Sequence, residues 1–271
     1  MKEIITVAYK NPHKHITSSE IIRQYSTNKD DIREIALAGL DLSEVHDVLD
    51  LGCGFGYMSQ PVSLKTAENA LFLGVDVCPE NLPYFLEAVR ASGRKAEFIH
   101  YHIVKSLPWD SESFDFIIAS YSLYFFAEII PEIARVLRPL GMFLAITHSQ
   151  DSFSGLYAAS NLNDNNTPID KLISNFSGEN GEEKLDPFFD EIDCITYENS
   201  LHFNKENVDD LIEYTRFKYP LMLTPELHTQ NELAKLPSEI EASIKETLFK
   251  AKQVNIKKND VIFRCRRPRC P

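Results

Sequence analysis

Short apolar runs alternate with longer amphipathic stretches between residues 45 and 148. The apolar runs are VHDVLDL, LFLGVDV, AEFIHY, FDFIIAS and GMFLAITH, and most of them are separated by stretches with a helical spacing of apolar residues. Short apolar runs bounded by turn-forming residues are typical of buried strands, whereas apolar residues three and four positions apart are typical of helices. This alternation predicts an α/β fold in which crossover helices join five parallel strands.

Residues 18–40 precede the first strand and have a helical pattern. Ser18 and Ser19 stand where a first helix would be capped, and Asn28, followed by two aspartates, resembles the start of a second helix. We therefore expect two short helices before the sheet.

The chain changes character after the fifth apolar run. Residues 149–168 are rich in Ser, Asn and Asp and lack periodicity, which predicts a mobile connection. Residues 189–203 and 258–268 have strand-like patterns, and helical material fills much of 205–252 between them. The stretch 205–252 is therefore interpreted as an insertion between the last two strands.

The composition is that of a folded globular protein, and it disfavours nucleic-acid and membrane partners. Apolar residues make up 44% and charged residues 25% of the chain, close to the average for folded globular proteins. The formal net charge of −12 repels a phosphate backbone, so no nucleic-acid partner is expected despite the basic end that begins at Arg264. No stretch approaches the roughly 20 apolar residues of a membrane-spanning helix, so we expect a cytoplasmic protein with no membrane partner.

Metal and redox motifs are not expected. The five cysteines are Cys53, Cys78, Cys194, Cys265 and Cys270, which are scattered and form no CxxC pair. This arrangement favours buried, reduced thiols. His13 and His15 are close together but have no further ligands nearby in sequence, so we expect no metal site.

The segment VLDLGCGFGY joins an apolar strand to a glycine-rich turn. Asp50 ends the strand, and Gly52, Gly54 and Gly56 follow at alternate positions. Glycine at such a turn allows tight backbone conformations and close approach to a ligand. The dinucleotide fingerprint GxGxxG would place its third glycine at position 57, where this chain has a tyrosine.

A second acidic residue follows the next apolar run. Asp76 ends LFLGVDV, about twenty residues after the glycine turn, where a carboxylate can accept hydrogen bonds from both hydroxyls of a ribose. The turn and Asp76 together predict a site for a cofactor that contains a nucleoside.

Four motifs in this order resemble the class I methyltransferases that bind S-adenosylmethionine, in particular the small-molecule type. They are VLDLGCGFG, GVDV, LPWDSESFDFIIAS and IARVLRPLGMFLAITH, and they cover roughly residues 45–148. The resemblance implies a Rossmann-like sheet of mostly parallel strands with an antiparallel last strand, helices on both faces and a helical lid or insertion. It also implies S-adenosyl-L-methionine as the cofactor and S-adenosyl-L-homocysteine as the product.

The resemblance also implies which residues bind the cofactor. They are Asp50, Gly52, Cys53, Gly54, Gly56, Asp76, Val77, His102, Ile103 and Ser120. Asp50, Gly52 and Gly54 would line the methionine end, Asp76 would hold the ribose, and Val77 would pack against the adenine. Family members often carry an acidic residue before the LPF-like motif that binds the adenine amino group, and this chain has His102 or Ile103 there.

The methyl acceptor is expected just beyond the fourth and fifth strands. The expected acceptor-binding residues are Tyr25, Tyr121, Tyr124, His148 and Asn175, and the candidate catalytic residues are His148 and Tyr121. The donor's methyl group is intrinsically reactive, so the protein must mainly align the acceptor and exclude water. A hydroxyl, thiol or ammonium acceptor also needs a base, and His148 is either that base or a hydrogen-bonded structural histidine. The aromatic side chains either enclose the acceptor or pack in the core. The stretch 173–183 around Asn175 is either a ligand-bearing lid or a solvated loop.

A length of 271 residues suits one α/β domain with insertions. We expect a single domain over 1–271 with these parts: an N-terminal helical segment over the cofactor at 1–44, a cofactor-binding core at 45–148, a lid or connection at 149–188, and a helical insertion at 205–252.

Three functions remain open at this point. The first is S-adenosylmethionine-dependent methyl transfer to a small-molecule acceptor. The second is a catalytically inactive S-adenosylmethionine-binding protein with a regulatory or interaction role. The third is an NAD-dependent oxidoreductase, which would use the same acidic residue on the ribose but needs a different glycine spacing. The accepting atom and the oligomeric state, for which a homodimer is one option, are not determined by the sequence.

Overall fold

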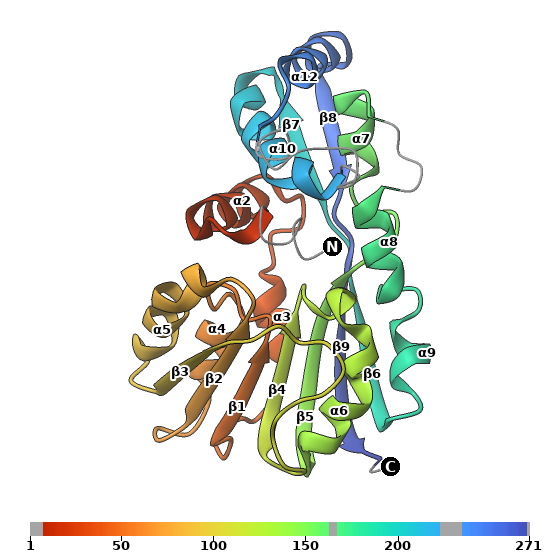
Figure 1. The fold of residues 1–271 in the computed structure, drawn as a ribbon. Helices are drawn as coiled ribbons and strands as arrows, with labels where there is room; N and C mark the ends of the chain where they lie inside the picture. Colours follow the sequence, from red (N-terminus) through yellow and green to blue (C-terminus); the bar gives the residue numbers. More distant parts are fainter. Residues whose placement is uncertain (1–7, 163–166, 223–234, 270–271) are drawn as a thin grey trace. The chain divides into compact units, whose positions relative to one another are not determined.

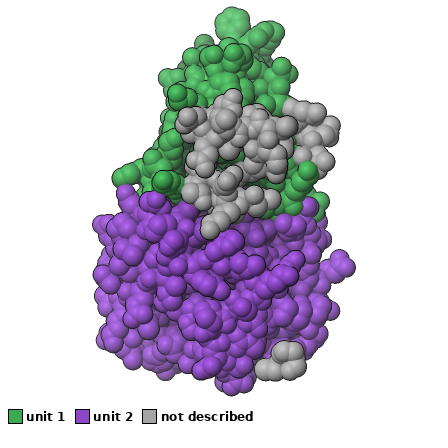
Figure 2. Space-filling view, viewed as in Figure 1, with its two compact units in different colours: residues 1–29, 149–172, 198–259 green, residues 30–148, 173–197, 260–271 purple. Residues whose placement is uncertain are grey.

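The computed structural model describes residues 8–162, 167–222 and 235–269 (Figure 1). The chain divides into two compact units, which Figure 2 colours separately. Unit 2 contains residues 30–148, 173–197 and 260–271, and unit 1 contains residues 1–29, 149–172 and 198–259. The chain passes repeatedly from one unit to the other, and the expected single domain with its four parts stays a prediction.

A seven-stranded sheet forms the centre of unit 2, in the order β3-β2-β1-β4-β5-β9-β6. Its strands are β1 Asp47–Leu51, β2 Leu71–Asp76, β3 Lys95–His100, β4 Phe114–Ser120, β5 Leu137–His148, β6 Phe189–Tyr197 and β9 Asp260–Pro268. Strands β1 to β5 pair in parallel, and β9 pairs antiparallel with both β5 and β6. The five predicted parallel strands and the antiparallel last strand are confirmed. The strand order reverses beside β1, and open α/β sheets bind ligands at such a point, outside the carboxyl ends of the strands.

Helices pack around this sheet. The α-helices of unit 2 are α3 Ile32–Leu37, α4 Ser59–Ser63, α5 Leu82–Arg90, α6 Ile130–Val136 and α9 Gly181–Leu185. Successive strand residues face opposite sides of a sheet, and β9 shows both sides. Ile262 belongs to the buried cluster that includes residues of α3, α4 and α5, whereas the ring of Phe263 contacts Phe176, with ring centroids 5.6 Å apart. β9 is therefore buried on both faces over its first six residues, as its continuous apolar run requires.

Asn11 caps α2 (Pro12–Tyr25), and its side chain accepts a hydrogen bond from the backbone N–H of Lys14. The prediction that Ser18 or Ser19 caps this helix is wrong, since both lie inside it. Asp31 caps α3 by accepting from the backbone N–H of Arg33, close to the predicted second start. The first helix begins earlier because Asn11 is followed by Pro12, a residue whose fixed φ suits the first turn of a helix.

Unit 1 is built from helices and a small sheet. Its elements are α2, α7 Ser154–Ser160, the first part of α8 Pro168–Asn175, β7 Ser200–Asn204, η4 Lys205–Asn207, α10 Val208–Met222, α12 Ser238–Ala251 and β8 Gln253–Lys257. β7 and β8 form an antiparallel two-stranded sheet. Its apolar side chains, among them Leu201, Phe203 and Ile256, are buried together with Tyr214 of α10 and Ile244 of α12. A two-stranded sheet is marginal alone, so the packing of these helices accounts for its presence.

The predicted long strand at 189–203 is divided between the two units. β6 ends at Tyr197, and Asn199 donates its backbone N–H to the side-chain oxygen of Asn259 instead of continuing the strand pairing. The next strand, β7, then pairs with β8, a strand that the sequence did not predict. The side chain of Asn259 thus competes with the sheet for the backbone N–H of Asn199, which explains why one apolar pattern gives two strands.

The stretch 149–168, expected to lack regular structure, contains α7, and residues 163–166 lie outside the described part. The expected loop at 173–183 contains the end of α8 and the start of α9. Serine and asparagine lower the helical propensity of these segments, but burial of Leu156 and Leu185 in the folded chain outweighs it.

The described cysteines are thiols that form no disulfide with one another, and Cys53, Cys78 and Cys265 are buried as predicted. Cys194 is exposed because it lies on β6, the edge strand of the sheet. Cys270 lies outside the described residues. In the described part of the chain, no helix combines the length and apolar character needed to cross a membrane.

Candidate functional site

Four predicted site residues stand at or next to the ends of neighbouring parallel strands. Asp50 is the second-last residue of β1. Asp76 ends β2, Ser120 ends β4 and His148 ends β5. Parallel strands present their carboxyl ends at one edge of the sheet, so these residues lie along the same edge of unit 2. The register places Asp50 beside Gly74 of β2 and Ile118 of β4.

Asp50 is a buried carboxyl group, 2% exposed, whose Oδ2 accepts a hydrogen bond from the hydroxyl of Ser59 at 2.6 Å. Burial raises the pKa of Asp50 to about 7, the Ser59 hydrogen bond opposes this rise, and the negative charge of Asp76 adds to it. A cationic group placed near Asp50 would favour its ionised form. Asp50 therefore suits the methionine end of the cofactor, which carries an ammonium and a sulfonium.

The turn after β1 depends on glycine. Gly52 has a φ of +72° and Gly56 a φ of +85°, both in the left-handed region. A Cβ atom at Gly52 would lie 2.5 Å from Cβ of Ser122, and one at Gly56 would lie 2.9 Å from Cβ of Ala88. The backbone N–H groups of Gly52 and Cys53 donate to the carbonyl oxygen of Val75 at 2.8 and 3.1 Å. The turn is thus tied to the end of β2.

Asp76 links the glycine turn to the loop after β2. Its Oδ2 accepts from the backbone N–H of Gly54 at 2.8 Å, and its Oδ1 accepts from the backbone N–H of Cys78 at 2.8 Å. Burial raises the pKa of Asp76, although hydrogen bonds from Cys78, Gly54, Asn81 and Val77 oppose the rise. These four donors favour the ionised carboxylate, which only accepts hydrogen bonds, and a ribose hydroxyl bound here would share or replace one of them. The residues present therefore fit the nucleoside part of S-adenosylmethionine.

The residues predicted to surround adenine follow β2 and β3. The carbonyl oxygen of Val77 is 3.0 Å from Nε2 of His100. Ile103 is buried and His102 is exposed, so the apolar side chain is turned into unit 2 and the imidazole is not. An apolar contact from Ile103 to adenine stays a prediction, as does any role of His102.

The aromatic residues after β4 gather around His148. Tyr121 has a φ of +56°, an uncommon conformation for a residue with a bulky side chain. Its ring centroid lies 4.8 Å from that of His148, and the ring of Tyr124, in η2 (Leu123–Phe125), lies 6.0 Å from His148 and is stacked on it. Asn175 donates from its side chain to the carbonyl oxygen of Tyr124 at 3.3 Å. Four of the five predicted acceptor residues are therefore brought together in unit 2.

Tyr25, the fifth predicted acceptor residue, belongs to unit 1. Its hydroxyl donates to Oδ2 of Asp210, and its ring contacts that of Phe203 with centroids 4.6 Å apart. Burial, followed by the hydrogen bond to Asp210, raises the pKa of Tyr25 to about 12. A contact of Tyr25 with an acceptor stays a prediction.

Sequence reasoning missed Asp260, the first residue of β9. Its Oδ1 is 2.7 Å from Nδ1 of His148, and its Oδ2 accepts from the hydroxyl of Tyr121 at 2.8 Å. The available signal was an acidic residue at the start of an apolar strand in KNDVIF. Sequence reasoning also missed Ser122, whose hydroxyl donates to the carbonyl oxygen of Leu51 at 2.5 Å.

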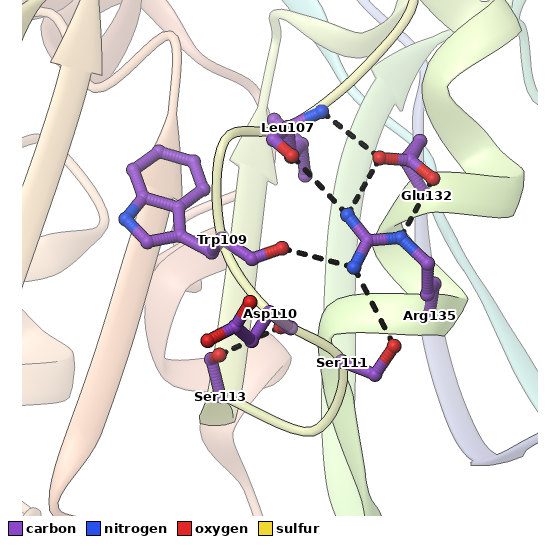
Figure 3. A network of polar contacts seen from close by, with 7 residues as sticks. All are labelled: Leu107, Trp109, Asp110, Ser111, Ser113, Glu132 and Arg135. Atoms are coloured by element: carbon purple, nitrogen blue, oxygen red, sulfur yellow. Dashed lines mark hydrogen bonds and ion pairs between the residues drawn. The ribbon is translucent and has the colours of Figure 1, made fainter.

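The loop LPWDSES, which is the first half of the motif LPWDSESFDFIIAS, has a structural role (Figure 3). Arg135 of α6 donates to the carbonyl oxygens of Leu107 at 3.2 Å and Trp109 at 2.9 Å, and it pairs with Glu132 at 2.7 Å. Glu132 in turn accepts from the backbone N–H of Leu107 at 3.0 Å. The loop LPWDSES is thus fastened to α6 by one guanidinium and one carboxylate.

His15 of the HKH segment lies between aromatic rings in unit 1. Its ring stacks on Phe217 with centroids 5.3 Å apart and meets Tyr9 edge-on at 5.1 Å. Burial, with a smaller contribution from Lys218, lowers the pKa of His15 to about 3. In the ranges that the structure describes, no three His, Cys, Asp or Glu side chains are grouped so that they could hold a metal ion.

Part of the chain matches known proteins in sequence. Residues 48–141 match the family of the methyltransferase domain. The uncharacterized methyltransferase YcgJ of Bacillus subtilis (strain 168) is 30% identical over 106 residues, which are 38% of this chain and 41% of that protein. The similar stretch therefore spans about two fifths of that relative.

Solved structures match over a longer part of the chain at lower identity. The Bacillus halodurans C-125 protein BH2331 has a TM-score of 0.55 at 17% identity, covering 89% of this chain and 100% of that chain. The Haemonchus contortus phosphoethanolamine N-methyltransferase 2, in complex with phosphomonomethylethanolamine and S-adenosylhomocysteine, has a TM-score of 0.54 at 14% identity, covering 98% of this chain and 59% of that chain. Likeness at these identities shows the fold.

The sequence match and the fold agree on the same part of the molecule. The matched residues 48–141 contain the glycine turn, Asp76 and the parallel strands β1 to β4, together with the start of β5. The sheet has the mostly parallel strands and the antiparallel last strand that the resemblance implied. Residues 48–141 therefore resemble a methyltransferase domain in sequence, and they lie in a sheet that has the Rossmann-like methyltransferase fold.

Proposed function

We propose that this protein transfers a methyl group from S-adenosylmethionine to a small-molecule acceptor. The observation that carries the proposal is the pair of buried carboxyl groups, Asp50 and Asp76, joined by the glycine turn within the matched residues 48–141. A buried carboxyl group is unfavourable unless a partner compensates it. Cationic groups and ribose hydroxyls are suitable partners for these two.

The proposed site residues form two groups: one binds the cofactor and the other orients the acceptor. Asp76 accepts hydrogen bonds from the ribose, the glycine turn allows close approach of the backbone, and Asp50 faces the positive charge at the methionine end. When bound, S-adenosylmethionine supplies a methyl group activated by its sulfonium. Tyr121, Tyr124 and His148 orient the acceptor and exclude water at the end of β4 and β5.

A small molecule is the acceptor class we propose, because the formal net charge of −12 disfavours nucleic acid. The cytoplasm is the compartment we propose, since the four described cysteines are thiols that form no disulfide with one another, and three of them are buried. The accepting atom is treated in the next section.

Calorimetric titration of the purified chain with S-adenosylmethionine, S-adenosylhomocysteine and NAD tests the cofactor. We expect binding of the first two and none of NAD. Binding of NAD alone would contradict the proposal and favour an NAD-dependent oxidoreductase. Asp76→Asn, which keeps the shape of the side chain and removes its charge, should weaken S-adenosylhomocysteine binding, whereas Asp190→Asn on the exposed edge strand β6 should not.

Transfer is tested with a radioactive methyl group on S-adenosylmethionine and a cell extract separated into small molecules and macromolecules. Label recovered in the small-molecule fraction supports the proposal. Label recovered in protein or nucleic acid contradicts the acceptor class, and binding without any transfer favours the inactive binding protein.

A further inference from the structure

Asp260 and His148 are direct partners in the sheet of unit 2. The antiparallel register of β9 with β5 pairs Asp260 with His148, and the register of β9 with β6 pairs Asp260 with Tyr197. Residues directly opposite each other in an antiparallel pair project to the same face, with Cβ atoms about 5 Å apart. The pairing of strands therefore brings the carboxylate and the imidazole together, without help from a loop.

The carboxylate of Asp260 contacts His148, the last residue of β5, and Tyr121, the residue that follows β4. Its Oδ1 meets Nδ1 of His148 at 2.7 Å, and its Oδ2 accepts from the Tyr121 hydroxyl at 2.8 Å. Asp260 is 2% exposed, and the Tyr121 hydroxyl donates to its Oδ2, which favours the ionised form against the effect of burial. An ionised carboxylate only accepts hydrogen bonds, so its contact with Nδ1 of His148 requires a proton on that nitrogen.

Other titratable groups face this carboxylate from the neighbouring elements. Burial, with Asp260 as the next cause, raises the pKa of Tyr121 well above its usual value and that of Tyr197 to about 12. Burial likewise raises the pKa of Tyr57, against the effect of Arg33, whose guanidinium lies 4.9 Å from the centre of the Tyr57 ring. These phenols therefore keep their protons in the neutral pH range, where an imidazole titrates.

We propose that Asp260 is a positioning residue that holds His148 as the general base for a hydroxyl or ammonium acceptor. The acceptor's proton moves to Nε2 of His148 as its O–H or N–H bond breaks. The electron pair left on oxygen or nitrogen forms the new bond to the methyl carbon of the sulfonium donor. The methyl–sulfur bond breaks, its electrons remain on sulfur as a thioether, and His148 then releases the proton to water. This inference rests on the proposed methyl transfer and adds the class of acceptor.

The tautomer of His148 is the first measurement, and it needs no acceptor. The full chain is labelled with ¹⁵N at histidine, saturated with S-adenosylhomocysteine, and studied by NMR at pH 8.5. The signal of His148 is assigned by its contacts with the rings of Tyr121 and Tyr124 and by its loss in His148→Gln. We expect a proton on Nδ1 and none on Nε2. A proton on Nε2 instead would overturn the proposal.

The second measurement tests whether Asp260 acts on His148. An ionised partner raises the pKa of an imidazole, so Asp260→Asn should lower the pKa of His148 by about one pH unit or more. Asp115→Asn is the matched control, since Asp115 is a hydrogen-bonded carboxylate of the same unit on β4 that pairs with Arg138. It should leave the pKa of His148 unchanged. An equal pKa of His148 in the wild type and in Asp260→Asn would refute the positioning role. If Asp260→Asn does not fold, the wild-type tautomer alone decides.

Failure of this inference can be told apart from failure of the proposed function. Calorimetry on the same sample reports whether S-adenosylhomocysteine binds. Absence of binding contradicts the proposed function whatever the state of His148. Binding together with a proton on Nε2 leaves the methyl transfer standing and removes only the assigned base.

Discussion

Gly54 donates its backbone N–H to Oδ2 of Asp76 at 2.8 Å, so the side chain that ends β2 holds the glycine turn. The second oxygen of the same carboxylate is held by the backbone N–H of Cys78. Asp76 therefore has a structural role in the turn, beside the role toward a ribose that we propose. Its two roles can be separated by comparing stability with cofactor affinity.

The first prediction concerns Asp76→Asn. The amide keeps one oxygen for the backbone but brings an NH₂ group to face the other N–H donor and removes the charge. Hydrogen bonds to a charged group contribute about 1.5–3 kcal/mol, so we expect affinity for S-adenosylhomocysteine to fall roughly 10- to 100-fold. Calorimetry measures the affinity, and urea denaturation measures the stability. A loss of stability with unchanged affinity would leave Asp76 only its structural role.

The second prediction separates two effects at glycine. Gly39 and Gly52 have nearly the same φ, +73° and +72°, but a Cβ atom has no atom within 4 Å at Gly39 and meets Cβ of Ser122 at 2.5 Å at Gly52. A left-handed φ costs a non-glycine residue about 1–2 kcal/mol. We expect this loss in unfolding free energy for Gly39→Ala, and about 1–3 kcal/mol more for Gly52→Ala because of the overlap. Urea denaturation measures both.

The overlap at Gly52 has its own test. Ser122→Gly removes the Cβ that a new methyl group would meet. In this background, Gly52→Ala should be no more destabilising than Gly39→Ala. A loss as large as in the wild-type background would show that crowding by Ser122 is not the cause.

The cofactor half of the site was predictable because its signals are local. Strand, turn and glycines fall within ten residues in VLDLGCGFGY, and Asp76 ends the next apolar run. Asp260 lies 112 residues from His148 in the chain, and only the antiparallel register of β9 brings the two together. The division of 189–203 into β6 and β7 was equally hidden, since it depends on the side chain of Asn259. Patterns along the chain predict elements, whereas such contacts depend on how the elements pair.

The third prediction is a pH dependence of stability from Asp50. Its pKa is raised to about 7 by burial, against about 3.9 in an unfolded chain. Between these values the folded state binds more protons than the unfolded state, so the unfolding free energy falls as pH rises from 4 to 7. Asp50→Asn removes this slope. The unfolding free energy of Asp50→Asn minus that of the wild type should be larger at pH 8 than at pH 4.5, by on the order of 2–4 kcal/mol.

Asp115→Asn is the control for this slope. Burial raises the pKa of Asp115, but Arg138 and the backbone N–H groups of Asp47 and His46 lower it more, so the net shift is downward. The ionised Asp115 stabilises the folded chain at any pH above its pKa in the unfolded chain. This stabilisation is lost only as pH falls through its lower pKa in the folded chain. The effect of Asp115→Asn should therefore be nearly the same at pH 8 and pH 4.5. A pH-dependent gain for Asp115→Asn equal to that for Asp50→Asn would remove the assignment to Asp50.

The fourth prediction concerns the loop before β4, which Arg135 fastens to α6 (Figure 3). The guanidinium of Arg135 reaches two carbonyl oxygens and both oxygens of Glu132, and a lysine ammonium at this position cannot repeat that fork. We expect Arg135→Lys to lower the unfolding free energy by about 1–2 kcal/mol and to speed hydrogen exchange at the N–H of Leu107. Arg216→Lys is the matched control, because Arg216 pairs with Glu213 and Glu241 on an exposed surface and touches no loop carbonyl in the contacts observed. Arg216→Lys should lower the unfolding free energy by less than about 0.5 kcal/mol. Equal losses in the two variants, with unchanged exchange at Leu107, would mean that Arg135 contributes only as a surface charge.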